Sequence, residues 1–324
     1  MGETMYSIGI DLGGTNIAVG LCDEKLNIVD KLSTPTKAER GADAIVLEMA
    51  SATKRLLSRN GLDVPDVSHV GIAAPGSINA ECGVVEYSNN IKMENFPMVE
   101  KFREHLPIDK IYIENDANAA ALGEALGGAA KGSRSSVMVT LGTGVGSGII
   151  IDGKIFSGGL NSAGAEIGHT VICFGGRQCT CGRRGCFEAY SSASALIAMT
   201  KETMAELELK RIPSALFDIA KRDGKVSART AFDAMRANDE HGKRLVQSYI
   251  EYLAAGIANI VNVFQPEVIT IGGGVSNERE TLTAPLRALA NSEQYTRLNK
   301  VKTKIVTATL GNDAGIVGAA GLGV

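Results

Sequence analysis

The sequence contains no tryptophan, and aromatic residues make up only 5% of it. It therefore offers few of the aromatic platforms on which single-stranded nucleic acids stack. It also lacks a basic excess, because 33 lysines and arginines stand against 36 aspartates and glutamates, for a net charge of −3. Binding to a phosphate backbone depends on such an excess, so neither DNA nor RNA is an expected partner.

The sequence has no hydrophobic run of the kind that anchors a protein in a membrane. Its most apolar long stretch, 245–264, carries Gln247, Glu251, Asn259 and Asn262 at helical spacing, which indicates a buried helix. The first eleven residues have neither a basic start nor an apolar core, so we expect no secretory leader. The sequence therefore predicts a cytoplasmic protein without a membrane partner.

Glycine is the residue in excess, with 38 of 324 positions against an average of about 7%. Three glycine-rich turns, at 12–16, 141–148 and 271–276, each follow an apolar strand pattern. Glycine lets backbone N–H groups approach phosphate oxygens, and threonine hydroxyls add donors. One such turn alone is typical of a hairpin, but three favour a phosphate-bearing ligand. No P-loop is present, and the dinucleotide-binding fingerprint is incomplete.

The length favours two domains, since a typical domain has roughly 100–200 residues. An 18-residue segment recurs at a constant offset that aligns Leu12-Gly13 with Leu141-Gly142. Each copy predicts strand, glycine turn and strand, so we expect two related α/β domains. Periodicity predicts strands at 6–10, 17–22, 28–33, 70–74, 111–113, 137–141, 148–151, 268–272 and 301–307, and helices at 42–58, 117–126, 188–209, 242–264 and 311–324.

Two aspartates stand where predicted strands end. Asp11 precedes the first glycine turn, where it would either cap the turn or sit near a magnesium ion, through water, beside a phosphate. Asp116 ends the run Glu114-Asn115-Asp116, where it could take a proton from a substrate hydroxyl while Asn115 hydrogen-bonds to a sugar. Asp is equally a preferred helix N-cap, so both interpretations stay open.

Four potential metal ligands, His169, Cys179, Cys181 and Cys186, lie within eighteen residues. Four soft or borderline ligands this close in sequence suit a closed, tetrahedral and therefore structural zinc site. The alternative is disulfides or buried thiols, and a cytoplasmic location argues against disulfides. The other cysteines, Cys22, Cys82 and Cys173, have apolar neighbours and are predicted to be core residues.

Two carboxylates, Glu166 and Glu188, flank the cysteine-rich segment. They are either solvated surface groups or, if zinc fixes the segment, positioned acceptors for a polyol. In the second case His169 could also offer its second ring nitrogen to that polyol.

Together these motifs resemble the ROK family of bacterial sugar kinases and related repressors, and most of all its glucokinases. The resemblance covers nearly the whole chain. It rests on Asp11-Leu12-Gly13-Gly14-Thr15-Asn16, Ala74-Pro75-Gly76, Glu114-Asn115-Asp116, Leu141-Gly142-Thr143-Gly144, Glu166-Ile167-Gly168-His169, Cys179-Thr180-Cys181-Gly182-Arg183-Arg184-Gly185-Cys186 and Gly272-Gly273-Gly274.

The resemblance implies a fold and a division of the chain. The fold is the two-domain, α/β actin-like ATPase fold of sugar kinases, Hsp70 and actin, with a cleft between the domains. The small domain would comprise 1–116 together with the C-terminal helix 311–324, and the large domain 117–310 with the zinc loop. The family resemblance also implies a homodimer.

The resemblance further implies an ATP-dependent hexose kinase that phosphorylates O6 of glucose, with Asp116 as general base and a place in glycolysis. The sugar would be held by Gly76, Asn90, Asn115, Asp116, Glu166, His169 and Glu188. ATP and Mg²⁺ would be held by Asp11, Gly13, Gly14, Thr15, Asn16, Gly142, Thr143, Gly144, Gly272, Gly273 and Gly274. Structural Zn²⁺ would be bound by His169, Cys179, Cys181 and Cys186.

Other functions remain as alternatives. The run Tyr87-Ser88-Asn89-Asn90 is less typical of glucokinases, so the hexose could be N-acetylmannosamine, allose, mannose or fructose. A sugar-responsive repressor would carry an N-terminal winged helix-turn-helix, for which the strand that begins near Tyr6 leaves no room. An actin- or chaperone-like ATPase would leave the zinc ligands unexplained.

Overall fold

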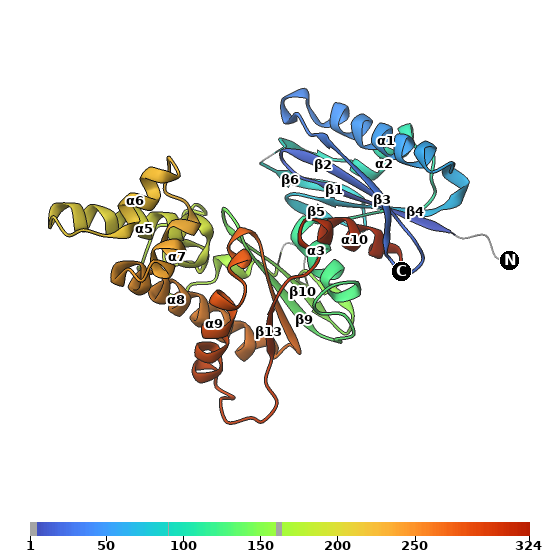
Figure 1. Cartoon of the computed structure of the whole chain (residues 1–324). Coiled ribbons are helices and arrows are strands. Elements are labelled where there is room, and N and C mark those ends of the chain that lie inside the picture. Colours follow the sequence, from blue (N-terminus) through green and yellow to red (C-terminus); the bar gives the residue numbers. More distant parts are fainter. Residues whose placement is uncertain (1–4, 90, 160–163) are drawn as a thin grey trace. The chain divides into compact units, whose positions relative to one another are not determined.

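The computed structural model describes residues 5–89, 91–159 and 164–324 (Figure 1). By its internal contacts the chain divides into two compact units. The first unit comprises Met1–Met138, Gly148–Ala165 and Ala308–Val324, and the second comprises Val139–Ser147 and Glu166–Thr307. Both ends of the chain therefore belong to the first unit.

The first sheet has five strands in the order β3-β2-β1-β4-β8. Strand β2 is antiparallel to β1 and β3, whereas β1, β4 and β8 run parallel to one another. The parallel strands are buried along most of their length, as expected for strands covered on both faces. The bounds are β1 (Tyr6–Leu12), β2 (Asn16–Cys22), β3 (Ile28–Pro35), β4 (Val67–Ala74) and β8 (Ile111–Asn115).

Helices cover both faces of the first sheet (Figure 1). Apolar side chains of α1 (Ala42–Arg59) and α2 (Met98–His105) join one core with the strands. On the other face, α10 (Ala314–Ala320) contacts β1 and β4 and packs against α3 (Asp116–Leu126). Gly71 of β4 allows this close packing, because a side chain there would overlap the carbonyl of Ala319.

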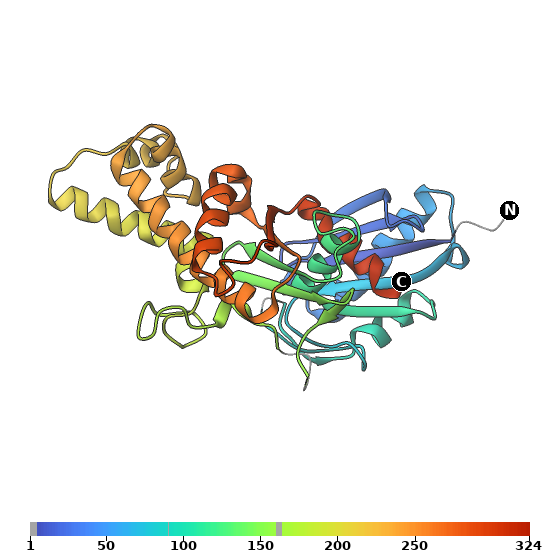
Figure 2. The ribbon, with the colours of Figure 1, turned by 90° about the horizontal axis from the view of Figure 1, so that it is seen from below.

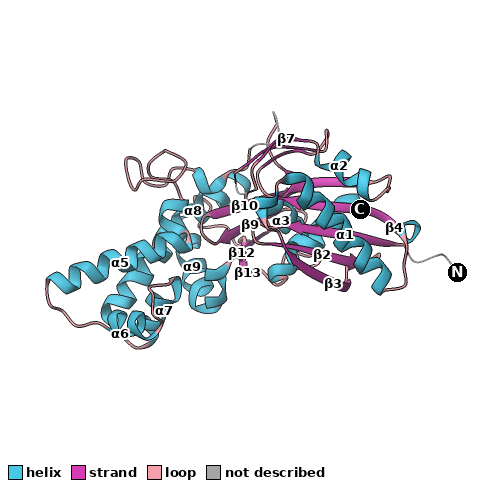
Figure 3. Cartoon of the chain, turned by 90° about the horizontal axis from the view of Figure 1, so that it is seen from above, coloured by secondary structure: helices cyan, strands magenta, loops and turns pink. Residues whose placement is uncertain are grey.

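The second sheet repeats the strand order of the first, β11-β10-β9-β12-β13. Figure 3 labels β10, β9, β12 and β13 among the magenta strands. Strand β10 pairs antiparallel with β11, and β12 runs parallel to β13, as β2 does with β3 and β4 with β8. The repeat predicted from the glycine turns is thus confirmed as a duplicated topology. The bounds are β9 (Ser136–Leu141), β10 (Val145–Ile151), β11 (Lys154–Phe156), β12 (Val268–Gly272) and β13 (Lys304–Thr307).

The second unit carries a group of helices around the long helix α8, coloured yellow to red in Figures 1 and 2. Helix α8 contacts α4, α5, α7 and α9, and its Tyr249 is buried with the hydroxyl donating to the carbonyl of Ser191 at 2.7 Å. None of the helices in the described ranges combines the length and the apolarity needed to cross a membrane. The bounds are α4 (Glu188–Ser191), α5 (Ala193–Leu209), α6 (Ala215–Arg222), α7 (Ala228–Arg236), α8 (Glu240–Phe264) and α9 (Glu280–Glu293).

Several predicted elements differ from the structure. The predicted helix 188–209 is two helices, because Ser192 breaks it and its hydroxyl accepts the N–H of Ala195 at 3.0 Å as an N-cap. The predicted strand 301–307 begins only at Lys304, and Val301 before it is exposed. The prediction that Cys82 is a core residue is wrong, because it is exposed in a turn.

A third sheet, β5-β6-β7, was not predicted. Its strands β5 (Ser77–Asn79), β6 (Val84–Ser88) and β7 (Met93–Phe96) are antiparallel and too short to show a clear alternation of apolar residues. Single 3₁₀ turns complete the chain at Ala38–Arg40, Val64–Asp66, Ile167–His169, Gly274–Glu278, Gly311–Asp313 and Gly321–Gly323.

Candidate active site

The carboxyl ends of the parallel strands in the first sheet bring several predicted site residues to one edge. Asp11 of β1 pairs in register with Ala73 of β4, and Ala74 of β4 pairs with Asn115 of β8. In open α/β sheets, ligands bind just outside this edge. The structure therefore places Asp11, Gly76 and the Asn115-Asp116 pair where a substrate is expected.

Asn115, and not Asp116, is the N-cap of α3. Its side-chain oxygen accepts the backbone N–H groups of Ala117 at 2.9 Å and Asn118 at 3.2 Å. The alternative that Asp116 only caps the helix is therefore wrong. Asp116 is instead the first helical residue, half-buried, with Oδ1 accepting the N–H of Ala117 at 2.8 Å.

Asn115 also ties the end of β8 to the turn after β4. Its amide nitrogen donates to the carbonyl of Gly76 at 3.0 Å. Gly76 has φ of 110°, and a side chain there would collide with the carbonyl of Tyr87, so this turn requires glycine. Both ends of the Asn115 amide are thus engaged in positioning the edge of the sheet.

The carboxylate of Asp11 is largely buried beside Asp116. Burial, and then the negative charge of Asp116, raise the pKa of Asp11 from 3.8 to about 6. Among the described residues no donor reaches this carboxylate, so Asp11 does not cap the glycine turn. The turn is closed instead by the N–H of Gly13, which donates to the carbonyl of Asn16 at 2.9 Å. A hydrated cation would stabilise the ionised form of such a buried carboxylate, because its bound water could donate hydrogen bonds to it.

The other two glycine turns lie together in the second unit. Gly273, with φ of 79°, follows β12, and a side chain there would overlap the backbone of Leu141 at the end of β9. In the turn after β9, the N–H of Gly142 donates to the carbonyl of Gly144 at 3.0 Å and leaves Thr143 exposed. The structure thus joins the turns at 142–144 and 272–274, while the turn at 13–16 belongs to the first unit.

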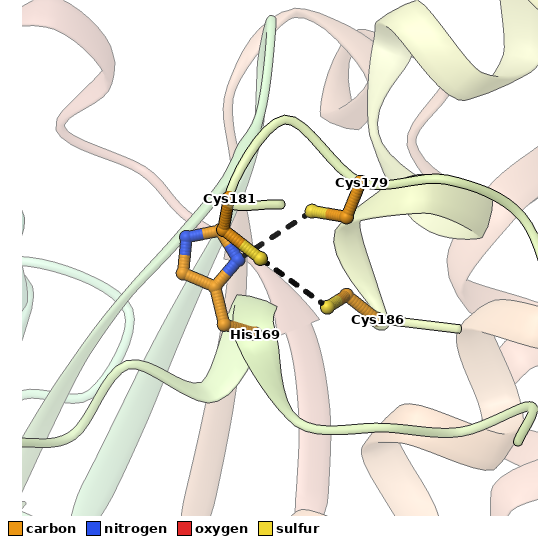
Figure 4. A group of neighbouring side chains, drawn as sticks. All are labelled: His169, Cys179, Cys181 and Cys186. Carbon is orange, nitrogen blue, oxygen red and sulfur yellow. Dashed lines mark hydrogen bonds between the residues drawn. The ribbon is translucent and has the colours of Figure 1, made fainter. Parts of the chain in front are cut away.

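Four ligand atoms converge in the second unit, from His169, Cys179, Cys181 and Cys186 (Figure 4). All lie within 4.8 Å of one another. The Sγ atoms of Cys181 and Cys186 are 3.7 Å apart, as are Nδ1 of His169 and Sγ of Cys179. Ligands at tetrahedral zinc, with Zn–S of about 2.3 Å, stand about 3.5–3.8 Å from one another. The donor set and its spacing therefore fit zinc.

A short hairpin carries three of these ligands. Isolated bridges join Val171 to Cys186 and Gln178 to Arg184, and the N–H of Cys179 donates to the carbonyl of Arg183 at 2.9 Å. Burial raises the pKa of the Cys186 thiol to about 12. A bound divalent cation would favour loss of that proton, because its positive charge would balance the negative charge of the buried thiolate.

Glu188 lies against the same cluster and is half-buried, so the alternative of a solvated surface carboxylate is wrong for it. Its Oε2 accepts the N–H of Val145 at 3.1 Å, and its Oε1 accepts the hydroxyl of Thr180 at 3.1 Å and the thiol of Cys179 at 3.5 Å. Sequence reasoning missed Thr180, whose only signal was its place between two ligand cysteines.

The remaining predicted sugar ligands are Glu166, His169 and Asn90. Glu166 is exposed, and its carbonyl accepts the N–H of His169 at 3.0 Å. Nδ1 of His169 faces Cys179, so Nε2 points away from the sulfur atoms (Figure 4). Asn90 lies outside the described residues.

Comparison with known proteins shows which family this chain belongs to. The model of the ROK family matches residues 7–323. The chain belongs to the ROK family. It is 36% identical to a glucokinase of Halalkalibacterium halodurans, over 98% of this chain and 94% of that one. It is 35% identical to a glucokinase of Thermotoga maritima, over 97% and 96% of the two chains.

A solved structure of the same family extends this similarity to the fold. The ROK glucokinase of Streptomyces griseus, in complex with glucose and AMPPNP, matches with a TM-score of 0.77 and 32% identity over 98% of both chains. The predicted fold class is confirmed: the chain has the actin-like ATPase fold of the ROK sugar kinases.

Proposed function

We propose that this ROK protein is an ATP-dependent glucose kinase that phosphorylates the O6 hydroxyl. The observation that carries the proposal is the nearly complete match to relatives named glucokinase, at 35–36% identity. The neighbour that contains glucose and AMPPNP supports a sugar acceptor and an ATP donor. No observation favours a repressor or another hexose.

In this proposal Asp116 is the general base. Asn115, and not Asp116, accepts the capping N–H groups of α3, and the carboxylate of Asp116 would take the proton of the attacking hydroxyl. Phosphoryl transfer needs positioning and charge neutralisation more than covalent help, so a single base suffices. Gly76, Asn90, Asn115, Glu166, His169 and Glu188 would hold the sugar.

The three glycine turns would hold ATP. Gly13, Gly14, Thr15, Asn16, Gly142, Thr143 and Gly144 would bind the phosphates, and Gly272, Gly273 and Gly274 would lie by the adenosine. Asp11 would hold Mg²⁺ through water, which would account for a carboxylate that no donor reaches within the described part of the chain. Zn²⁺, when bound to His169 and the three cysteines, would supply rigidity to the hairpin that leads to Glu188.

We further propose a cytoplasmic homodimer that feeds glycolysis. None of the six cysteines forms a disulfide in the described residues, which suits a reducing compartment. The division into a small domain, 1–116 with 311–324, and a large domain, 117–310, remains part of the same proposal.

The test is an ADP-release assay of the purified protein with ATP, Mg²⁺ and glucose, followed by identification of the phosphorylated carbon by NMR. Glucose 6-phosphate is the expected product. ATP hydrolysis without a sugar product would contradict the proposal, as would phosphorylation only of a sugar other than glucose.

A further inference from the structure

Thr180, between the ligand cysteines Cys179 and Cys181, makes a side-chain hydrogen bond that zinc binding does not require. In the pattern Cys-x-Cys-Gly-x-x-Gly-Cys it is the first of the three positions that the motif leaves open. Its side chain is exposed, yet its hydroxyl donates to Oε1 of Glu188 at 3.1 Å, across eight residues of chain. A hydroxyl donor to a carboxylate is a charge-assisted bond, which is stronger than a neutral one.

The carboxylate of Glu188 has few other donors. Oε2 receives the N–H of Val145, and Oε1 receives, besides Thr180, the thiol of Cys179 at 3.5 Å. A cysteine that ligates zinc is a thiolate and has no proton to donate. In zinc-loaded protein Thr180 is therefore the remaining side-chain donor to Oε1 among these contacts.

We infer that Thr180 is a positioning residue for Glu188, and that it orients this carboxylate to accept two neighbouring sugar hydroxyls. The inference rests on the proposed function. An ionised carboxylate offers about four acceptor sites. The N–H of Val145 uses one site on Oε2 and the hydroxyl of Thr180 one on Oε1. Each oxygen then keeps one site, which matches a pair of adjacent hydroxyl donors.

The alternative is that Thr180 serves only the hairpin. Its neighbours Cys179 and Gly182 are held by backbone bonds, in which the N–H of Cys179 reaches Arg183 at 2.9 Å and that of Gly182 reaches Cys179 at 3.1 Å. These bonds do not involve the Thr180 side chain. The hydroxyl can therefore be removed while the backbone of the hairpin stays intact.

The experiment compares three variants of the full-length, zinc-loaded protein. Thr180→Val keeps the shape of the side chain and removes its hydroxyl, whereas Thr180→Ser keeps the hydroxyl and removes the methyl group. Thr203→Val on α5 is the matched control, because its hydroxyl has no hydrogen-bond partner among the described residues. For each we would measure KM for glucose, KM for ATP, kcat, the Kd of glucose by calorimetry and the zinc content.

The expected result is a rise of about three- to tenfold in the KM and Kd of glucose for Thr180→Val, with zinc content and the KM of ATP unchanged. Thr180→Ser and Thr203→Val should match the wild type. An unchanged Kd in Thr180→Val would overturn the inference, as would loss of zinc or an equal defect in Thr180→Ser. A wild type that neither binds nor phosphorylates glucose would instead refute the proposed function itself.

Discussion

The carboxylate of Glu188 occupies the space that a side chain on Gly144 would need. A Cβ built on Gly144 falls well inside contact distance of Oε2 of Glu188. Gly144, which the sequence predicts at the ATP phosphates, therefore also leaves room for the Glu188 carboxylate, a predicted sugar ligand. The N–H of the next residue, Val145, donates to the same oxygen.

Gly144→Ala should impair glucose binding. The added methyl group has to displace the Glu188 carboxylate and so break its bond to Val145. We expect the Kd of glucose to rise at least about tenfold, as for a lost charged hydrogen bond. The matched control is Gly142→Ala in the same turn, where a Cβ meets nothing within 4 Å. Calorimetry with glucose checks both; equal affinities for the two variants would contradict the steric argument.

Purified protein should contain about one zinc ion per chain. The four ligand atoms lie within 4.8 Å of one another, and the metal would hold the hairpin beside Glu188. Elemental analysis checks the content. Cys186→Ser should lose most of the zinc, while Cys82→Ser, which alters an exposed cysteine outside the cluster, should keep it. Metal-free protein with full activity would rule out this role.

Asp116→Asn should nearly abolish turnover and leave glucose binding measurable. The substitution keeps the side-chain oxygen that accepts the N–H of Ala117 but removes the basic carboxylate. Loss of a general base costs roughly 10²–10⁴-fold in rate. Asp109→Asn, at an exposed aspartate before β8, is the control and should keep the wild-type rate. If Asp116→Asn turns over within threefold of the wild type, another group is the base.

Asp11→Asn should stabilise the protein in a pH-dependent way when magnesium and ATP are absent. The pKa of Asp11 is about 6 in the folded chain against 3.8 ordinarily, so above pH 6 folding confines a charge that the unfolded chain solvates freely. The cost is about 1–3 kcal/mol at pH 7.5, shrinks as the pH falls through 6, and is gone below about pH 4, where both states are neutral.

Thermal unfolding of wild type and variant between pH 4 and 8 measures this difference. The expected outcome is a higher midpoint for Asp11→Asn at pH 7.5 that converges on the wild type in acid. Asp218→Asn, at an exposed position on α6, should show no such trend. A variant that is less stable than the wild type at pH 7.5 would show that Asp11 stabilises the fold.

The fold and much of the site follow from local sequence signals, whereas individual contacts do not. Glycine after an apolar strand marked all three turns, and the spacing of His169 and the cysteines predicted a cluster that the structure assembles. The N-cap of α3 could not be assigned, because Asn115 and Asp116 are adjacent and both are good caps. The hydrogen bond from Thr180 to Glu188 could not be predicted either, because it depends on how the hairpin folds back on α4.

Glucose should be the best hexose substrate. In the proposed site Asn115, Glu166, His169 and Glu188 would hold the ring hydroxyls, and a site built for hydroxyls rejects analogues that lack them. An N-acetyl group would need an apolar surface, and the chain has no tryptophan to supply a broad one. Values of kcat/KM for glucose, mannose, allose, fructose and N-acetylmannosamine decide the matter. Glucose should exceed each of the others; a tenfold preference for any other sugar would overturn the assignment of glucose while leaving the kinase activity intact.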